Sequence, residues 1–229
     1  MEMNRSMARS VIYHTLSLCS CYPDESVYGW ISEGEWIRRL DEALDLLNEE
    51  RLKQLLDPFE KWLSEKGEDE ALEMAREYTR LFINAFPHVV APPYGSVYLE
   101  KDGRVFGSST SEVLRFYHEA GFTLKENIGD LPDHLAHELE FMGILAGKES
   151  QVSAQEKIEL EEIQMTFLSR FVFPWVPSFC DRVERETRSP FYRGLCLLTK
   201  EFIHFERNYL GIPEELSPAR AAESDTRGG

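Results

Sequence analysis

Apolar residues recur at steps of three and four positions along most of this chain, and this spacing constrains its fold more than any other feature. The clearest run is Phe191, Leu195, Leu198, Phe202, Phe205 and Tyr209. A second run is Ala71, Met74, Tyr78, Leu81 and Ala85. Such steps place side chains on one face of an α-helix. Strand-like alternation is scarce, and a hairpin is an option only over 96–106. We therefore predict an all-α fold with about eight helices.

Helix-capping residues predict where several of these helices begin. Ser109 with Glu112, and Ser153 with Glu156, have the spacing of a capping box, in which each side chain bonds the backbone N–H of the other residue. Ser189, which precedes a proline, is a suitable N-cap for the last helix. Local signals thus agree with the apolar periodicity.

One long connection divides the predicted helices into two groups. The stretch 87–108 lacks helical periodicity, and a loop of about twenty residues inside a compact helical domain is uncommon and usually functional. We predict a single all-α domain over 1–212, with an N-terminal lobe over about 1–86 and a C-terminal lobe over about 109–212. A polar tail, expected to be loose, covers 213–229.

Composition limits the class of partner. The formal net charge is −16, which argues against nucleic acid because affinity for phosphates rests on clustered Lys and Arg. An acidic surface either simply keeps a protein soluble or attracts a basic partner. The four cysteines show no metal or redox spacing, no apolar run approaches the ~18 residues of a membrane span, and no export signal is recognisable. We expect a cytoplasmic protein that does not insert into membranes.

Two segments combine residues that are typical of a site. The first is Ala91-Pro92-Pro93-Tyr94-Gly95-Ser96-Val97-Tyr98. Prolines restrict the backbone, so both tyrosines would be presented with little entropy to lose on binding. The alternative is that the two rings plug the base of the loop. Both uses are compatible.

The second segment is Leu131-Pro132-Asp133-His134-Leu135. With Asp130 as the N-cap, Pro132 would occupy the first helical turn and Asp133 would lie at the positive end of the helix dipole. A structural role can explain Asp133 in this way. It does not explain His134, since a cap does not call for histidine at that position.

A metal-dependent enzyme is an alternative, because His134, His137 and Glu138 share a helix face. Their order, however, fits neither zinc-protease motif, and no third ligand is placed nearby. No family signature of a nucleophile and its base is found either. We therefore predict a binding protein without catalytic residues, metal ion or cofactor of its own. A helical scaffold or sensor is a further alternative.

Together, these motifs resemble the TorD/DmsD/NarJ family of molybdoenzyme maturation chaperones. The matching residues are Tyr78-x-x-Leu81-Phe82, Pro87, Pro92-Pro93-Tyr94-x-Ser96-Val97-Tyr98 and Pro132-Asp133-His134-Leu135-x-x-Glu138-Leu139-x-Phe141-Met142. A weaker similarity is Phe171-x-x-Pro174-Trp175-x-Pro177-x-Phe179. One departure is Leu131, where many members have Glu. The resemblance implies a TorD-like, all-α chaperone in two lobes that is not an enzyme.

The resemblance also implies a partner. The protein would bind the twin-arginine signal, or a related N-terminal segment, of a molybdopterin-containing oxidoreductase subunit and assist cofactor insertion before export or assembly. The peptide-binding region of the family falls on Tyr94, Ser96, Tyr98, Pro132, Asp133, His134 and Glu138. Carboxylates beside an aromatic groove suit a basic and apolar signal. A monomer and a lobe-exchanged homodimer are both compatible with the long connection.

Overall fold

The computed structural model describes residues 3–86, 88–124 and 130–213 of the chain. Within these ranges the regular structure is helical, and the β-pairing consists of a single bridge between Tyr94 and His134. The all-α prediction is therefore confirmed. The predicted tail lies outside the described residues from 214 onward. Among the helices that the structure describes, none has both the length and the apolar character needed to cross a membrane.

The described ranges contain twelve α-helical segments. They are α1 (Arg5–Cys19), α2 (Glu25–Glu33), α3 (Glu35–Leu47), α4 (Glu50–Lys53), α5 (Asp57–Glu65), α6 (Glu70–Tyr78), α7 (Gly95–Leu99), α8 (Ser108–Glu119), α9 (Leu135–Lys148), α10 (Ala154–Phe167), α11 (Val176–Glu186) and α12 (Pro190–Tyr209). Short 3-10 turns, η1 (Gln54–Leu56) and η3 (Glu149–Gln151), follow α4 and α9. Single π-helical turns, η2 (Thr79–Ile83) and η4 (Leu168–Val172), extend α6 and α10.

The helices outnumber the predicted eight for two local reasons. First, α4 and α7 span only 4 and 5 residues, which is too short for apolar periodicity to reveal them. Second, α2 and α3 are separated by Gly34 alone, whose φ of 75° lies in the left-handed region that glycine enters without a steric penalty. A single residue therefore turns the chain between two helices that follow each other directly in the sequence.

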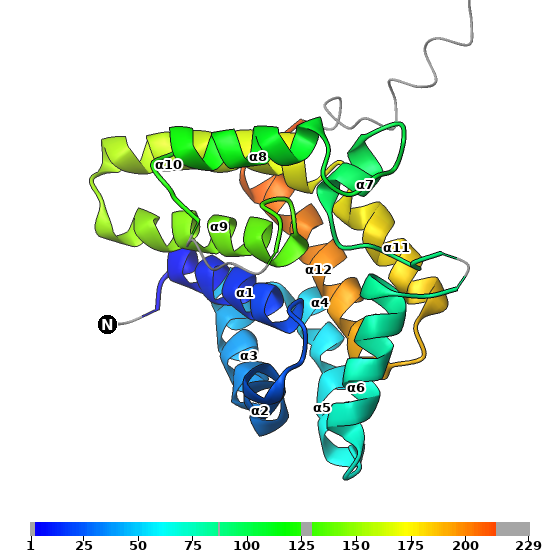
Figure 1. Cartoon of the computed structure of the whole chain (residues 1–229). Coiled ribbons are helices and arrows are strands. Elements are labelled where there is room, and N and C mark those ends of the chain that lie inside the picture. Colours follow the sequence, from blue (N-terminus) through cyan, green and yellow to red (C-terminus); the bar gives the residue numbers. More distant parts are fainter. Residues whose placement is uncertain (1–2, 87, 125–129, 214–229) are drawn as a thin grey trace, which may run out of the picture.

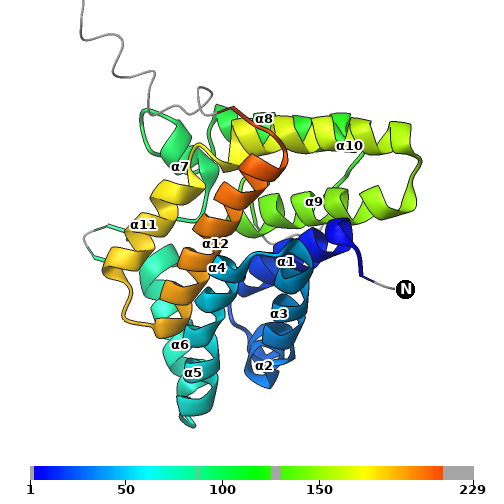
Figure 2. The same ribbon diagram turned by 180° about the vertical axis from the view of Figure 1, so that it is seen from behind.

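One apolar core joins helices from both sides of the 87–108 connection. Helix α1 packs against α9 and α3, while α12 packs against α11 and α5. Figure 1 shows α1 running beneath α9, with α8 and α10 side by side above it. Figure 2 shows from behind how α12 runs from the upper layer down to α5 and α6. The division into two lobes stays a prediction.

Helices α1 and α9 approach closely because small residues line their contact. The hydroxyl of Ser10 donates to the carbonyl of Gly143 at 2.8 Å, and that of Ser17 donates to the carbonyl of Ala136 at 2.7 Å. A Cβ atom added at Gly147 would lie 2.9 Å from the Ser10 hydroxyl oxygen. This contact fixes the position of α9, whose first turn carries the predicted site.

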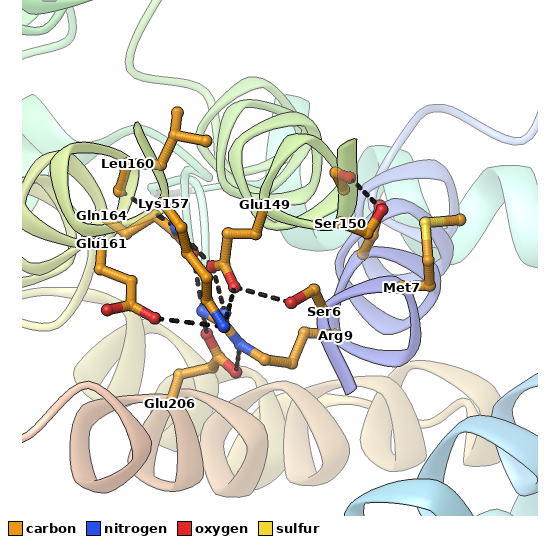
Figure 3. Close-up of polar contacts among 12 residues, drawn as sticks. Ser6, Met7, Arg9, Glu149, Ser150, Lys157, Leu160, Glu161, Gln164 and Glu206 are labelled. Atoms are coloured by element: carbon orange, nitrogen blue, oxygen red, sulfur yellow. Dashed lines mark hydrogen bonds and ion pairs between the residues drawn. The ribbon is translucent and has the colours of Figure 1, made fainter. Parts of the chain in front are cut away.

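A buried polar network ties α1 to the C-terminal half of the chain (Figure 3). Arg9 is 0% exposed. Its guanidinium donates to both carboxylate oxygens of Glu206 at 2.7 and 2.6 Å, and to Glu149 and Gln164 at 2.7 Å each. Lys157, at the edge of the network, lies 3.7 Å from the Glu149 carboxylate. Residues of α1, η3, α10 and α12 thus meet around one cation.

The charges in this network stabilise one another. Burial alone would lower the pKa of Arg9, but the carboxylates of Glu206 and Glu149 outweigh it and raise the pKa above its usual value. For Glu149 the directions are reversed. Burial alone would raise its pKa, but the charge of Arg9 holds the pKa below the usual range. Both groups therefore stay ionised inside the core, where an unpaired charge is strongly unfavourable.

Two of the three serine N-caps predicted from the sequence are confirmed. The side chains of Ser153 and Ser189 each accept a backbone N–H in the first turn of α10 and α12. The capping box of Ser109 with Glu112 is wrong, because α8 begins at Ser108. The N–H and the hydroxyl of Ser109 donate instead to the carboxylate of Glu100, at 2.8 Å each.

Candidate functional site

The two segments singled out in the sequence meet in space. The N–H of Gly95 donates to the carbonyl of Asp133 at 2.9 Å, and the N–H of Leu135 donates to the carbonyl of Pro93 at 2.9 Å. We call this contact between 93–98 and 130–138 the α7–α9 junction. The hairpin considered over 96–106 is wrong, because α7 occupies its first half.

The predicted start of α9 is also wrong. Instead of Asp130, the N-cap is His134, whose Nδ1 accepts the N–H of Ala136 at 3.1 Å. Pro132 therefore lies outside the helix, where its carbonyl accepts the hydroxyl of Tyr117 at 3.1 Å. A histidine can take this role when its ring is neutral, since one ring nitrogen is then an acceptor.

Asp133 caps α7 rather than its own helix. Its Oδ2 accepts the N–H of Ser96 at 2.8 Å, and its backbone carbonyl accepts the N–H of Gly95 at 2.9 Å. The first N–H groups of a helix have no acceptor within that helix. Asp133, 37 positions after Ser96, supplies the acceptors for two of these N–H groups. This explains how a helix of five residues is held in place.

His134 is buried and uncharged. Burial lowers its pKa to about 4, although the nearby Asp130 carboxylate, 3.7 Å from Nε2, acts in the opposite direction. The ring packs edge-on against Tyr94, with ring centroids 5.2 Å apart. Because Nδ1 accepts a hydrogen bond, the proton of the neutral ring is assigned to Nε2.

Acid should weaken the junction through His134. Its pKa is depressed in the folded protein, so its contribution is present above the ordinary value near 6.5 and is lost as the pH falls toward about 4. His134→Asn keeps a capping acceptor but does not titrate. We expect wild type to lose up to about 3 kcal/mol of unfolding free energy between these pH values relative to the variant, in urea titrations. The exposed His118→Asn is the control, and identical pH profiles for wild type and His134→Asn would refute the assignment.

The side chain of Glu138 is buried beside Trp175. Its Oε2 accepts the indole N–H of Trp175 at 3.0 Å, and the indole stacks on Tyr98 with ring centroids 5.3 Å apart. Burial, together with the negative charge of Asp133, raises the pKa of Glu138 well above its usual value. A Cβ atom at Gly95 would lie 3.2 Å from Nε1 of Trp175 and 3.4 Å from Oε1 of Glu138, so a residue without a side chain suits this position.

The seven predicted site residues therefore converge, but the polar ones are covered. Ser96, Asp133 and Glu138 are 0% exposed and His134 is 3% exposed, whereas Tyr94, Tyr98 and Pro132 are half-buried. In this conformation the carboxylate of Asp133 bonds α7, the carboxyl group of Glu138 bonds the indole of Trp175, and neither faces solvent. The surface of the junction is formed by the two tyrosines and the proline.

The alternative metal site does not form. The His137 ring contacts the carbonyl of Leu131, with Nδ1 and O 2.7 Å apart, while His134 caps α9 and Glu138 pairs with Trp175. In the part of the chain covered by the structure, no group of three or more His, Cys, Asp or Glu side chains is arranged to hold a metal ion.

Exposed apolar side chains flank the junction in the sequence. Phe86 is 100% exposed and Ile83 is 54% exposed, on the N-terminal side. The N–H of Ala91 donates to the carbonyl of Leu81 at 2.8 Å and closes the loop that carries Phe86. On the other side, Phe106 is 69% exposed. These exposed side chains on both sides of the junction in the sequence are available for contact with a partner.

Sequence reasoning did not assign Trp175 and Tyr117 to the site. Trp175 stands in the Pro174-Trp175-x-Pro177 similarity, which was a usable signal, but nothing local indicates that its indole reaches Glu138. Tyr117 lies within the ordinary apolar pattern of α8, so its bond to the Pro132 carbonyl carries no sequence signal.

Comparison with known proteins identifies the family. The family described as nitrate reductase delta subunit matches residues 41–181, which include both segments of the junction. Chaperone protein TorD of Vibrio vulnificus (strain YJ016) is 28% identical over 144 residues, 62% of this chain and 66% of the relative. Chaperone protein TorD of Psychrobacter sp. (strain PRwf-1) is 29% identical over 143 residues, 62% of this chain and 64% of the relative. The match thus spans just under two thirds of the length of these relatives.

One solved structure aligns with this chain over most of its length. A protein from Archaeoglobus fulgidus that is assigned to redox enzyme maturation aligns with a TM-score of 0.46 and 21% identity, over 92% of this chain and 95% of that one. The family match covers more than half of the chain. The chain therefore belongs to the nitrate reductase delta subunit family, the TorD/NarJ family that its motifs resemble.

Proposed function

We propose that this protein is a chaperone that binds the twin-arginine signal, or a related N-terminal segment, of a molybdopterin-containing oxidoreductase subunit and assists cofactor insertion before export or assembly. The observation that carries the proposal is the family match over 41–181, among relatives named as chaperones. On this proposal the protein works in the cytoplasm by binding alone, without catalysis and without a cofactor of its own.

The α7–α9 junction would serve this function by positioning. Asp133 and Glu138 are covered, so their first role is to hold α7 and the Tyr94 and Tyr98 rings against α9. The exposed side chains of Ile83, Phe86 and Phe106 would then offer apolar surface on either side. A twin-arginine signal combines a basic head with an apolar stretch, which suits apolar side chains on a protein with a net charge of −16.

Magnitudes indicate which contact matters more. An exposed ion pair contributes about 0.2 to 1 kcal/mol, while a micromolar affinity corresponds to about 8 kcal/mol. Apolar burial would therefore supply most of the affinity, and charge would select the partner. Burying one large apolar side chain contributes about 1.5 to 3 kcal/mol.

Isothermal titration with a synthetic twin-arginine signal peptide tests the proposal. We expect micromolar binding, weakened about tenfold or more by Phe86→Ser because a fully exposed aromatic contact is removed. Leu72→Ser is the matched control, since Leu72 is also exposed but lies on α6, outside the loop. A peptide in which both arginines are replaced by glutamine should bind more weakly. A folded wild-type protein that binds neither peptide would contradict the proposed function.

A further inference from the structure

Unpaired polar atoms gather at one place in the core. Across the described residues, five buried side-chain atoms have no hydrogen-bond partner, and four of them belong to the α7–α9 junction. They are the hydroxyl oxygens of Ser96 and Tyr98, Oδ1 of Asp133 and Oε1 of Glu138. An unsatisfied buried polar group costs about 1 to 3 kcal/mol, so four in one cluster indicate a function for the cluster.

The two carboxyl groups cannot both be ionised here at low energetic cost. Each is 0% exposed, and two negative charges in a covered site repel each other. The Oδ2 atom of Asp133 already has a donor, the N–H of Ser96 in the first turn of α7. Glu138 has an indole N–H on Oε2 and a free Oε1, which suits a neutral acid that donates through Oε1.

The groups around Glu138 support this assignment. They are Asp133 from the segment before α9, Tyr117 from α8 and Trp175 from the turn before α11, while Gly95 of α7 lies against Oε1. On the side of α1, the hydroxyl of Ser17 donates its hydrogen bond to the carbonyl of Ala136. Burial and Asp133 both favour the neutral form of Glu138, and Trp175 alone acts against it.

We propose that Glu138, whose Oε1 lies against Gly95 of α7, is a neutral acid in the closed junction, and that its proton keeps α7 closed on α9. The proposal deepens the proposed function, on which its biological meaning rests. Loss of the proton would leave two buried negative charges, lift α7 and uncover both carboxylates. A guanidinium group from the partner segment would then take the place of the proton, which passes to solvent.

The pH dependence of closure follows from the raised pKa of Glu138. Its contribution is fully present below the ordinary Glu value near 4.3 and is lost as the pH rises through the raised value. His134 acts in the opposite direction, with its contribution lost only below about pH 6.5. Measurements above that pH therefore isolate Glu138.

Hydrogen–deuterium exchange on the protein alone provides the test. Protection of the amides of α7, corrected for intrinsic exchange and referred to α12, should fall by up to about tenfold with each pH unit above the ordinary Glu value, until the raised value of Glu138 is passed. Glu138→Gln keeps an acceptor and a donor but cannot ionise, so its α7 protection should stay level. Asp133→Asn removes the neighbouring charge and should move the transition to lower pH. If wild type and Glu138→Gln show the same pH dependence, the proposal is overturned.

Two further readouts complete the test. The infrared spectrum of wild type at neutral pH should contain the carbonyl stretch of a protonated carboxylic acid, absent in Glu138→Gln; a wild-type spectrum without it would also overturn the proposal. Titration of the twin-arginine peptide in buffers of different ionisation enthalpy should show about one proton released per peptide for wild type and none for Glu138→Gln. Because the exchange and infrared measurements need no partner, a failure of peptide binding would not contradict a protonated Glu138, and a failure of those measurements would not contradict the proposed function.

Discussion

Replacing Arg9 by Met is expected to lower the free energy of unfolding by about 3 to 5 kcal/mol. Met fills a similar volume, but the carboxylates of Glu149 and Glu206 then lie in the core without the cation that they contact at 2.6 to 2.7 Å. Desolvated charges without a partner are among the most destabilising groups in a protein. Urea denaturation at neutral pH, followed by circular dichroism, measures the change.

An exposed arginine provides the matched control. The Arg38 side chain is 58% exposed and forms ion pairs with Glu35 and Glu42 on the surface of α3. Arg38→Met should change the unfolding free energy by less than about 1 kcal/mol. Arg9→Met combined with apolar replacements of both buried glutamates should recover much of the loss, because no unpaired charge remains. If Arg9→Met alone is as stable as wild type, the network does not stabilise the fold.

Trp175→Ala is expected to have an effect of similar size, about 3 to 5 kcal/mol. The change opens a cavity at a fully buried position, removes the stack on Tyr98 and leaves Oε2 of Glu138 without its donor. Far-UV circular dichroism during urea denaturation is the suitable measurement, since the substitution itself alters tryptophan fluorescence. The exchange of α7 amides should rise in parallel, because α7 loses the ring against which it packs.

Two variants separate packing from hydrogen bonding at this position. Trp175→Phe keeps an aromatic ring but lacks the N–H, and we expect a loss of about 1 to 3 kcal/mol. Trp30 is half-buried and stacks on Trp36 with centroids 6.1 Å apart, so Trp30→Ala should have a clearly smaller effect than Trp175→Ala. Equal losses at the two tryptophans would show that Trp175 has no special role in the junction.

The parts of the fold that follow from local signals could be predicted from the sequence. The apolar stripe from Phe191 to Tyr209 forms α12, and Ser153 caps α10 as its spacing indicates. Helix α7 could not be predicted, because the group that caps it, Asp133, lies 37 positions away. The Ser109 prediction failed for the same reason, since Glu100 reaches the first turn of α8 from outside it.

The candidate site shows a similar division. Motifs selected residues that do meet, such as Tyr94 with His134 and Ser96 with Asp133. Their burial could not be predicted, because residue type alone suggests that charged groups are exposed. A buried carboxyl group costs less free energy when an N–H from a distant segment donates to it. The indole of Trp175 does so for Glu138, and the backbone of Ser96 does so for Asp133. Such partners are a property of the tertiary structure.

The Arg9 network also sets the order in which the chain can fold during translation. Arg9 is bonded to Glu149 and to Glu206, 140 and 197 positions further along the chain. At roughly 5 to 20 residues per second, a ribosome needs on the order of 10 to 40 seconds to reach Glu206 after starting the chain. Until then the guanidinium of Arg9 in α1 lacks the carboxylate of Glu206, to which it is bonded in the folded protein. Native packing of the first helix must therefore wait for the synthesis of α12, and contacts between such distant residues are expected to make refolding of the isolated protein slow.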